Sequence, residues 1–251
     1  MSLDVLARLK EWIQIILQNK YSRVGFFIIL FIVILAIGAP VIAPKHYAEV
    51  DLNNRLRPPS LQHLFGTDEL GRDVFSRVVY GTRIALWVGI LVVTIEAAIG
   101  VTLGMLAGYY GGKIDKVISA ITDMVWAFPP LVLALGVVTI IGPGLINVVT
   151  AVAIVSWPTF TRIVRAKVQS LVGREFVLAA RAIGESDLNI MLRYILPNVV
   201  PTIIVIATLS IPSAILSTTA LSFLGFGAQP PTPVWGAMVS DGMPRLTRAP
   251  W

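Results

Sequence analysis

Residues 24–44 read VGFFIILFIVILAIGAPVIAP, and no side chain among them is charged. As an α-helix this stretch would be roughly 31 Å long at about 1.5 Å per residue, which matches a hydrocarbon core of roughly 30 Å. It therefore predicts a membrane span. The whole chain shares this bias, since 56% of its 251 residues are hydrophobic and only 14% are charged, far from the composition of a soluble domain.

Apolar stretches after residue 83 predict four more spans. Residues 84–108 and 117–161 hold one ionisable side chain each. The second stretch is too long for a single span, and the Gly142–Gly144 break divides it in two. Residues 199–217 form the last apolar stretch of suitable length. The sequence therefore predicts an all-α integral membrane protein with five spans.

The polar segments between the spans predict the topology. Lys and Arg outnumber Asp and Glu six to three in residues 162–197, but only six to five in 45–83. Because cytoplasmic loops are enriched in Lys and Arg, we expect 162–197 in the cytoplasm, together with an amphipathic helix in 1–23. Residues 45–83, with a short helix near their end, are expected outside, as is a folded loop over 218–251.

Glu96 and Asp123 are the two acids within or near predicted spans. An ionised side chain at the centre of a lipid-facing helix costs about 2.5–3.5 kcal/mol, so both should face protein or water. They are candidates to line a transport pathway. The alternative is a structural role between helices. Separately, Gly100, Gly104 and Gly108 recur every four residues and form a stripe along one helix face, which predicts close packing against another helix.

The charged segment 162–197 contains the most specific pattern. Residues 175–184 read EFVLAARAIG, and 194–197 read YILP. This resembles the EAA signature of bacterial ABC importer permeases, although Leu178 stands where the signature has Glu and Tyr194 where it usually has Ile. The resemblance implies cytoplasmic coupling helices that dock on an ATPase through Glu175, Ala179, Ala180, Arg181, Gly184, Leu196 and Pro197. Small side chains would let such a helix sit deeply in a cleft of its partner, and the glycine would permit a sharp turn.

A second pattern narrows the family. Residues 63–77 read HLFGTDELGRDVFSR, and YGTR follows at 80–83. Together with FPPL at 128–131 and LSFLGFG at 221–227, they are similar to the second, C-type permease subunit of peptide and nickel importers. The resemblance covers nearly the whole chain.

The resemblance implies a type I importer permease fold, with the permease domain in 84–251 and a sixth span beyond residue 251. Expected partners are a related B-type permease, two ABC ATPase subunits, an external substrate-binding protein and the lipid membrane. ATP and Mg²⁺ would bind to the ATPases, and no cofactor, metal or catalytic site is expected here. The expected location is a bacterial or archaeal cytoplasmic membrane, which the chain crosses several times with its amino terminus inside.

Other functions fit the sequence less well. Nickel import is the alternative to import of small peptides, and His46 and His63 could hold nickel, but surface histidines are the simpler interpretation. A secondary transporter would couple through more intramembrane ionisable residues. An enzyme would need a catalytic motif, and neither HExxH nor GxSxG occurs in the sequence. The phosphate-binding motif GxxxxGK[ST] is also absent from it, so ATP hydrolysis is expected on another chain. Basic residues are scattered, so nucleic acid is not an expected partner.

Overall fold

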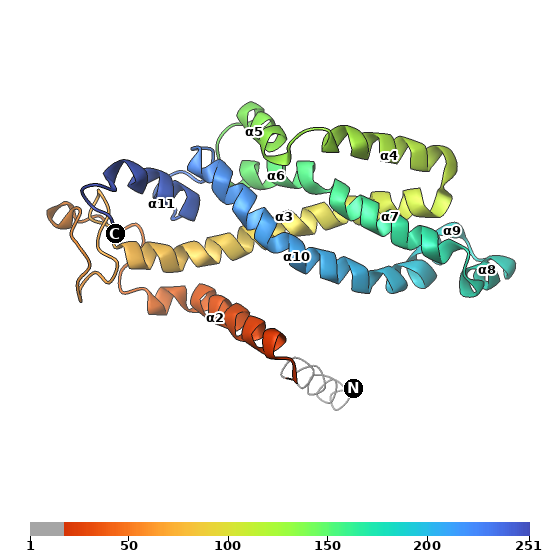
Figure 1. Ribbon diagram of the computed structural model, residues 1–251, viewed down its shortest axis with the longest axis horizontal. Helices are drawn as coiled ribbons and strands as arrows, with labels where there is room; N and C mark the ends of the chain where they lie inside the picture. Colours follow the sequence, from red (N-terminus) through yellow and green to blue (C-terminus); the bar gives the residue numbers. More distant parts are fainter. Residues whose placement is uncertain (1–17) are drawn as a thin grey trace. The chain divides into compact units, whose positions relative to one another are not determined.

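The computed structural model describes residues 18–251, so most of the helix expected in 1–23 lies outside the described residues. The described residues form two compact units, one that ends at Ile84 and includes Trp251, and another that comprises residues 85–250. Helices α2 and α3 are the first long elements (Figure 1). Within the described residues the structure is helical, apart from turns and one isolated bridge between Thr67 and Asp73.

Helix α2 spans Lys20–Ile42 and contains most of the first predicted span. Its start is fixed by Asn19, whose side chain accepts hydrogen bonds from the backbone N–H groups of Tyr21 and Ser22, as an N-cap does. Large apolar side chains along α2, such as Phe27 and Ile29, are exposed. An apolar and exposed surface is what lipid would cover.

The segment after α2 folds around two acidic side chains, Asp73, which is buried, and Asp68, which is half-buried. Asp68 pairs with Arg72 at 2.6 Å, while Asp73 accepts hydrogen bonds from the backbone and hydroxyl of Ser76 and contacts the ring of His63 at 3.0 Å. These contacts fix a loop that includes the short 3₁₀ helix Leu52–Asn54. Arg72 and Asp73 are adjacent in the chain, but each side chain has another partner.

Helix α3 spans Val74–Tyr110 without interruption. The short helix expected at the end of 45–83 and the second predicted span are therefore one continuous element. No proline or glycine pair breaks the helix near Arg83, so the change from polar to apolar composition does not end it.

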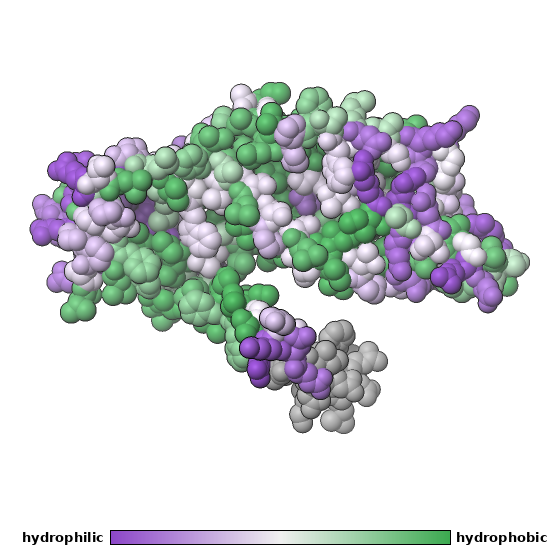
Figure 2. Space-filling view, in the orientation of Figure 1, coloured by the Kyte–Doolittle hydropathy of each residue, from purple (hydrophilic) through white to green (hydrophobic). Residues whose placement is uncertain are grey.

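The second unit contains the remaining helices (Figure 1). They are α4 Gly112–Trp126, α5 Pro130–Ile141, α6 Leu145–Ser156, α7 Pro158–Val172, α8 Glu175–Ala182, α9 Asp187–Asn189, the π-helix η2 Ile190–Ile195, α10 Leu196–Phe223, α11 Trp235–Gly242 and the 3₁₀ helix η3 Met243–Arg245. Figure 2 shows apolar side chains over α5, whereas polar ones gather around α8 and the adjoining ends of α4 and α7.

Several helix ends differ from the predicted ones. The fourth predicted span ends at residue 161, but α7 continues eleven residues further, to Val172. It can do so because Val164, Val168 and Leu171 are buried on one face while basic side chains occupy others. Helix α10 likewise continues past 217 to Phe223. Much of the expected loop over 162–197 is thus helical. Sequence reasoning ended the spans where charges begin, but an amphipathic helix continues across that boundary.

The number of spans agrees with the sequence. Among the described residues, four helices are long and apolar enough to cross a membrane, and there are five if the bent pair α4 and α5 is counted as one span. These two helices meet at 89°, where Pro129 and Pro130 interrupt the backbone hydrogen bonds. The predicted third span is therefore sharply bent.

The glycine stripe packs against α7. A Cβ atom at Gly100 would lie 2.4 Å from Cβ of Phe160, one at Gly104 would lie 2.8 Å from the carbonyl oxygen of Thr161, and one at Gly108 would lie 2.6 Å from Cβ of Val168. No real Cβ atom fits so closely, so the three glycines let the α3 backbone touch α7. The packing role predicted for the stripe is fulfilled within this chain.

Candidate coupling site

Helix α8 is a separate short helix because both of its ends are specified locally. Glu175 lies in its first turn and Arg181 in its last, as the helix dipole favours. At its end, the N–H of Gly184 donates to the carbonyl of Arg181, and the N–H of Glu185 donates to that of Ala180. These two bonds form a Schellman motif. The motif requires the left-handed φ of +83° at Gly184, which only glycine adopts readily.

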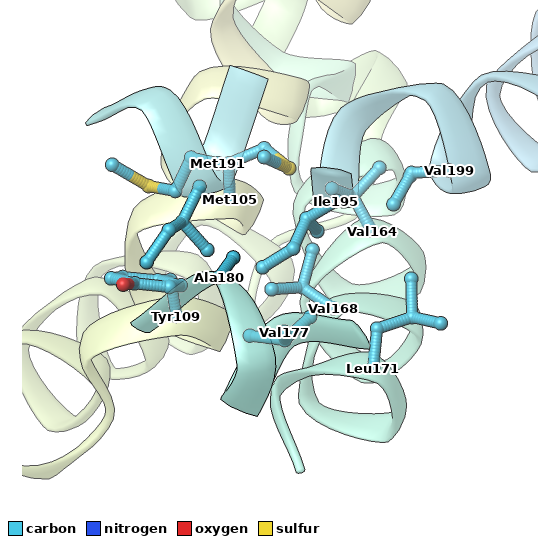
Figure 3. Packing of buried hydrophobic residues seen from close by; sticks show 11 residues of the cluster. Met105, Tyr109, Val164, Val168, Leu171, Val177, Ala180, Met191, Ile195 and Val199 are labelled. Atoms are coloured by element: carbon cyan, nitrogen blue, oxygen red, sulfur yellow. The ribbon is translucent and has the colours of Figure 1, made fainter. Parts of the chain in front are cut away.

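The inner face of α8 joins a hydrophobic cluster (Figure 3). Val177 and Ala180 pack there with Tyr109 from α3, Val168 from α7 and Ile195 from η2. Ala180 is only 2% exposed. The sequence interpretation placed both alanines against a partner protein, and for Ala180 the structure gives a different reason for its size: the side chain fits the core of this chain.

The outer face of α8 is exposed. Glu175, Leu178, Ala179 and Ala182 all lie on it, with Phe176 and Ile183 at its margins. Exposed apolar side chains at the polar end of a membrane protein are typical of an interaction surface. Of the two adjacent alanines, Ala179 is therefore the one available to another protein.

A polar clasp ties α8 to α3. The hydroxyl of Tyr109 donates to Oδ1 of Asp187 at 2.6 Å, and the guanidinium of Arg181 contacts the same hydroxyl at 3.4 Å. Arg181 also lies over the Tyr109 ring, 5.7 Å from its centroid. Sequence reasoning identified Arg181 but missed Tyr109 and Asp187, because their partners are more than seventy residues apart in the chain.

Leu196 and Pro197 begin α10, directly after the π-helix. Proline has no N–H to donate and its ring obstructs a regular turn before it. The wider π turn at Ile190–Ile195 provides room for this change, while Ile190 and Ile195 remain buried in the same cluster as Ala180. The structure therefore packs Ala180 and Leu196 into one cluster. Four other predicted site residues, Ala179, Arg181, Gly184 and Pro197, are exposed.

Removal of the Tyr109 hydroxyl should loosen α8. In Tyr109→Phe, Asp187 loses a charged hydrogen bond, which contributes about 1.5–3 kcal/mol. We expect faster amide hydrogen exchange throughout α8 while the rest of the helices keep their protection. Tyr110→Phe is the matched control, since Tyr110 is adjacent and exposed. Equal exchange in the two variants would show that the clasp does not hold α8.

The two candidate pathway acids lie in different surroundings. Glu96 is 4% exposed and its carboxyl is hydrogen-bonded to Ser156 of α6. Asp123 pairs with Arg162 of α7, and this carboxylate side chain is 64% exposed. The structure does not bring the two acids into one site. Glu96 has the contacts of a group that joins two helices.

Glu96→Gln should therefore transport its substrate at a rate within about twofold of the parent protein. Glutamine keeps the size and hydrogen-bonding ability needed to contact Ser156, and loses only the capacity to ionise. Initial rates of uptake into vesicles that contain equal amounts of each protein would measure this. A much lower uptake rate, with folding unchanged, would indicate that Glu96 lines the transport pathway.

The two histidines do not form a metal site with other ligands. Among residues 18–251, no three His, Cys, Asp or Glu side chains are placed to hold a metal ion. His63 is buried against Asp73, and Nδ1 of His46 accepts a hydrogen bond from the backbone of Ala48. Both rings therefore have local structural contacts.

Comparison with known proteins gives two matches to protein families. A family described as "Binding-protein-dependent transport system inner membrane component" matches residues 100–249, which include α8 and the start of α10. Another, described as "N-terminal TM domain of oligopeptide transport permease C", matches residues 8–59.

Individual relatives resemble the chain over most of its length. It is 49% identical over 234 residues to the dipeptide transport system permease protein DppC of Alkalihalophilus pseudofirmus, and 38% identical to the oligopeptide transport system permease protein OppC of Bacillus subtilis. It is also 48% identical over 237 residues to the glutathione transport system permease protein GsiD of Escherichia coli O157:H7. Each alignment covers 93% of this chain and 77% of the relative.

Proposed function

This chain belongs to the family of binding-protein-dependent transport system inner membrane components, and we propose that it carries small peptides through the membrane. Its fold is therefore that of a type I importer permease, and its role is that of a multi-pass transport subunit. Peptides are favoured because the relatives named above are permeases for a dipeptide, an oligopeptide and glutathione, which is itself a peptide. Nickel is not favoured, since both histidines have local contacts.

The proposed energy source is an ATPase that docks on the outer face of α8. The proposal rests on the contrast between two adjacent alanines: Ala180 is buried in this chain, and Ala179 is exposed among apolar side chains. The buried face attaches α8 to α3, α7 and α10, so a displacement of α8 by a partner would move the helices that cross the membrane. ATP and Mg²⁺ belong, in this proposal, to the partner.

The proposed assembly contains this chain, a related B-type permease, two ATPase subunits and an external substrate-binding protein. It would lie in the cytoplasmic membrane of a bacterium or archaeon with the amino terminus inside. The excess of Lys and Arg in residues 162–197 supports this orientation, because it places α8 on the side where ATP is available.

Uptake by the reconstituted assembly tests the function. Vesicles containing all subunits, with the binding protein outside and ATP inside, would be given a labelled dipeptide or nickel. We expect uptake of the dipeptide that depends on hydrolysable ATP, and none of nickel. ATP-dependent nickel uptake without peptide uptake would overturn the substrate, and peptide uptake that persists without ATP would overturn the energy source.

A further inference from the structure

A polar cavity lies between α4 and α7, two helices that run side by side (Figure 1). Its volume is about 360 Å³, within the usual size range of small-molecule sites. Its lining consists entirely of polar or charged residues, namely Ser119, Thr122, Asp123, Thr161, Arg162 and Arg165. The cavity belongs wholly to the second unit.

Two ion pairs join α4 to α7 here, and they differ in their exposure. Asp115 is held by two nitrogens of Arg165, and its side chain is only 16% exposed. Asp123 is held by one nitrogen of Arg162, and these side chains are 64% and 43% exposed. The first pair has the contacts of a structural link. The second keeps carboxylate and guanidinium surface free for another molecule.

The position of the exposed pair makes a lipid-facing role unfavourable. Asp123 lies about 15 Å along α4 from Lys113, a charged residue at the start of this helix. The bent pair of α4 and α5 has the length and composition of a membrane span. Charged side chains at such positions face protein or water-filled space and are commonly functional. Nearby Trp126 lies 3.9 Å from Arg162, measured from ring centroid to guanidinium carbon, and restricts the orientation of that guanidinium.

We propose that Asp123 and Arg162 bind the charged ends of a zwitterionic peptide in the transport pathway. This inference rests on the proposed peptide-import function. The peptide's ammonium group would pair with Asp123 and its carboxylate with Arg162, so that one ion pair within the protein is exchanged for two with the substrate. Because both the ion pair and the peptide are electrically neutral, the exchange adds no net charge to the membrane interior.

The chemistry of the pair fits this ligand better than a metal ion or a simple anion. A metal ion would meet the positive Arg162 and Arg165, and an anion would meet the negative Asp123. A zwitterion satisfies both signs at once. The guanidinium offers several N–H donors in one plane, which suits a carboxylate. The hydroxyl of Ser119, which is half-buried, can accept a hydrogen bond from an N–H group of a peptide.

Neutralisation of the two side chains, singly and together, tests the proposal in the complete assembly. The variants are Asp123→Asn, Arg162→Gln and the double variant, and the readouts are dipeptide uptake, ATPase activity stimulated by the binding protein, and the amount of assembled complex. We expect each single variant to slow uptake about tenfold, the loss of one charge-assisted contact. The double variant should be at least as slow, while assembly and stimulated ATPase activity stay unchanged.

The double variant distinguishes a substrate site from a structural ion pair. When both partners of a structural pair become neutral, little is lost because neither charge is left unpaired, so parental uptake by the double variant would overturn the proposal. Loss of the partner permease from the complex would also overturn it, by showing an interface contact.

The control is the double variant Lys45→Gln with Glu49→Gln, which neutralises another ion pair and should transport normally. Absence of peptide uptake by the parent assembly would instead overturn the proposed function itself.

Discussion

Replacement of Ala179 with Arg will leave the permease folded and uncouple it from ATP, whereas the same replacement at Ala180 will prevent folding. The two alanines are adjacent on α8, but Ala179 is exposed whereas Ala180 is buried. Arg at 180 would enter the cluster formed with Val177 and Ile195. An unpaired charge there should cost more than about 4 kcal/mol, a large part of the stability of an ordinary protein.

At position 179, Arg would remain in solvent in the isolated chain. In the assembly it would add bulk and charge to the face proposed to enter the ATPase. Substitutions at the centre of an interface commonly cost about 2–4 kcal/mol, so we expect uptake and co-purification of the ATPase to fall about a hundredfold. Yield and thermal unfolding of the permease alone should match those of the parent.

Ala179→Ser is the control for this pair, because it keeps a small side chain and should retain uptake. Folded and fully active Ala179→Arg would show that another surface receives the ATPase. Normal folding of Ala180→Arg would contradict the packing of α8 on its cluster. The two results are independent, since one depends on assembly and the other on the single chain.

Gly104→Val should strongly destabilise the contact between α3 and α7. A Cβ atom at this position would lie 2.8 Å from both the carbonyl oxygen of Thr161 and Cβ of Val164. Backbone and buried core would have to shift, and overpacking of this kind costs about 1–3 kcal/mol for modest additions and more for larger ones. We expect a lower free energy of unfolding in mixed detergent and less protein in the membrane.

Gly136→Val is the matched control. Gly136 also lies within an apolar helix, but a Cβ atom there would have no neighbour within 4 Å. Its effect should be within about 0.5 kcal/mol, or slightly stabilising, because valine favours helix over glycine. Equal losses for the two variants would mean that the glycine stripe does not determine the contact.

The membrane class and the number of spans could be predicted from composition and length alone. Uncharged stretches of about 20 residues have few alternatives to a spanning helix, and the glycine spacing correctly indicated close packing. The short helix of the coupling site was also predictable, because Gly184 is a stop signal recognisable in sequence. Those features depend on neighbouring residues in the chain.

Features that depend on distant residues could not be predicted. The sequence does not show which of two adjacent alanines faces inward, since that depends on where α3, α7 and α10 meet. The pairing of Asp123 with Arg162 was missed because Arg162 was assigned to a loop. Helix α7 continues through that boundary, and this continuation places the guanidinium beside α4.

The close packing of α3 on α7 has a consequence for the cell's energy supply. At Gly100, Gly104 and Gly108 the two backbones leave no room for a Cβ atom, and a water molecule, whose share of liquid volume is about 30 Å³, needs comparable room. Packing this close offers protons and sodium ions no water-filled route between α3 and α7 at these three positions. A cycle that keeps the α3–α7 contact closed and opens on the α4-facing side of α7 would import solute without opening a leak between α3 and α7.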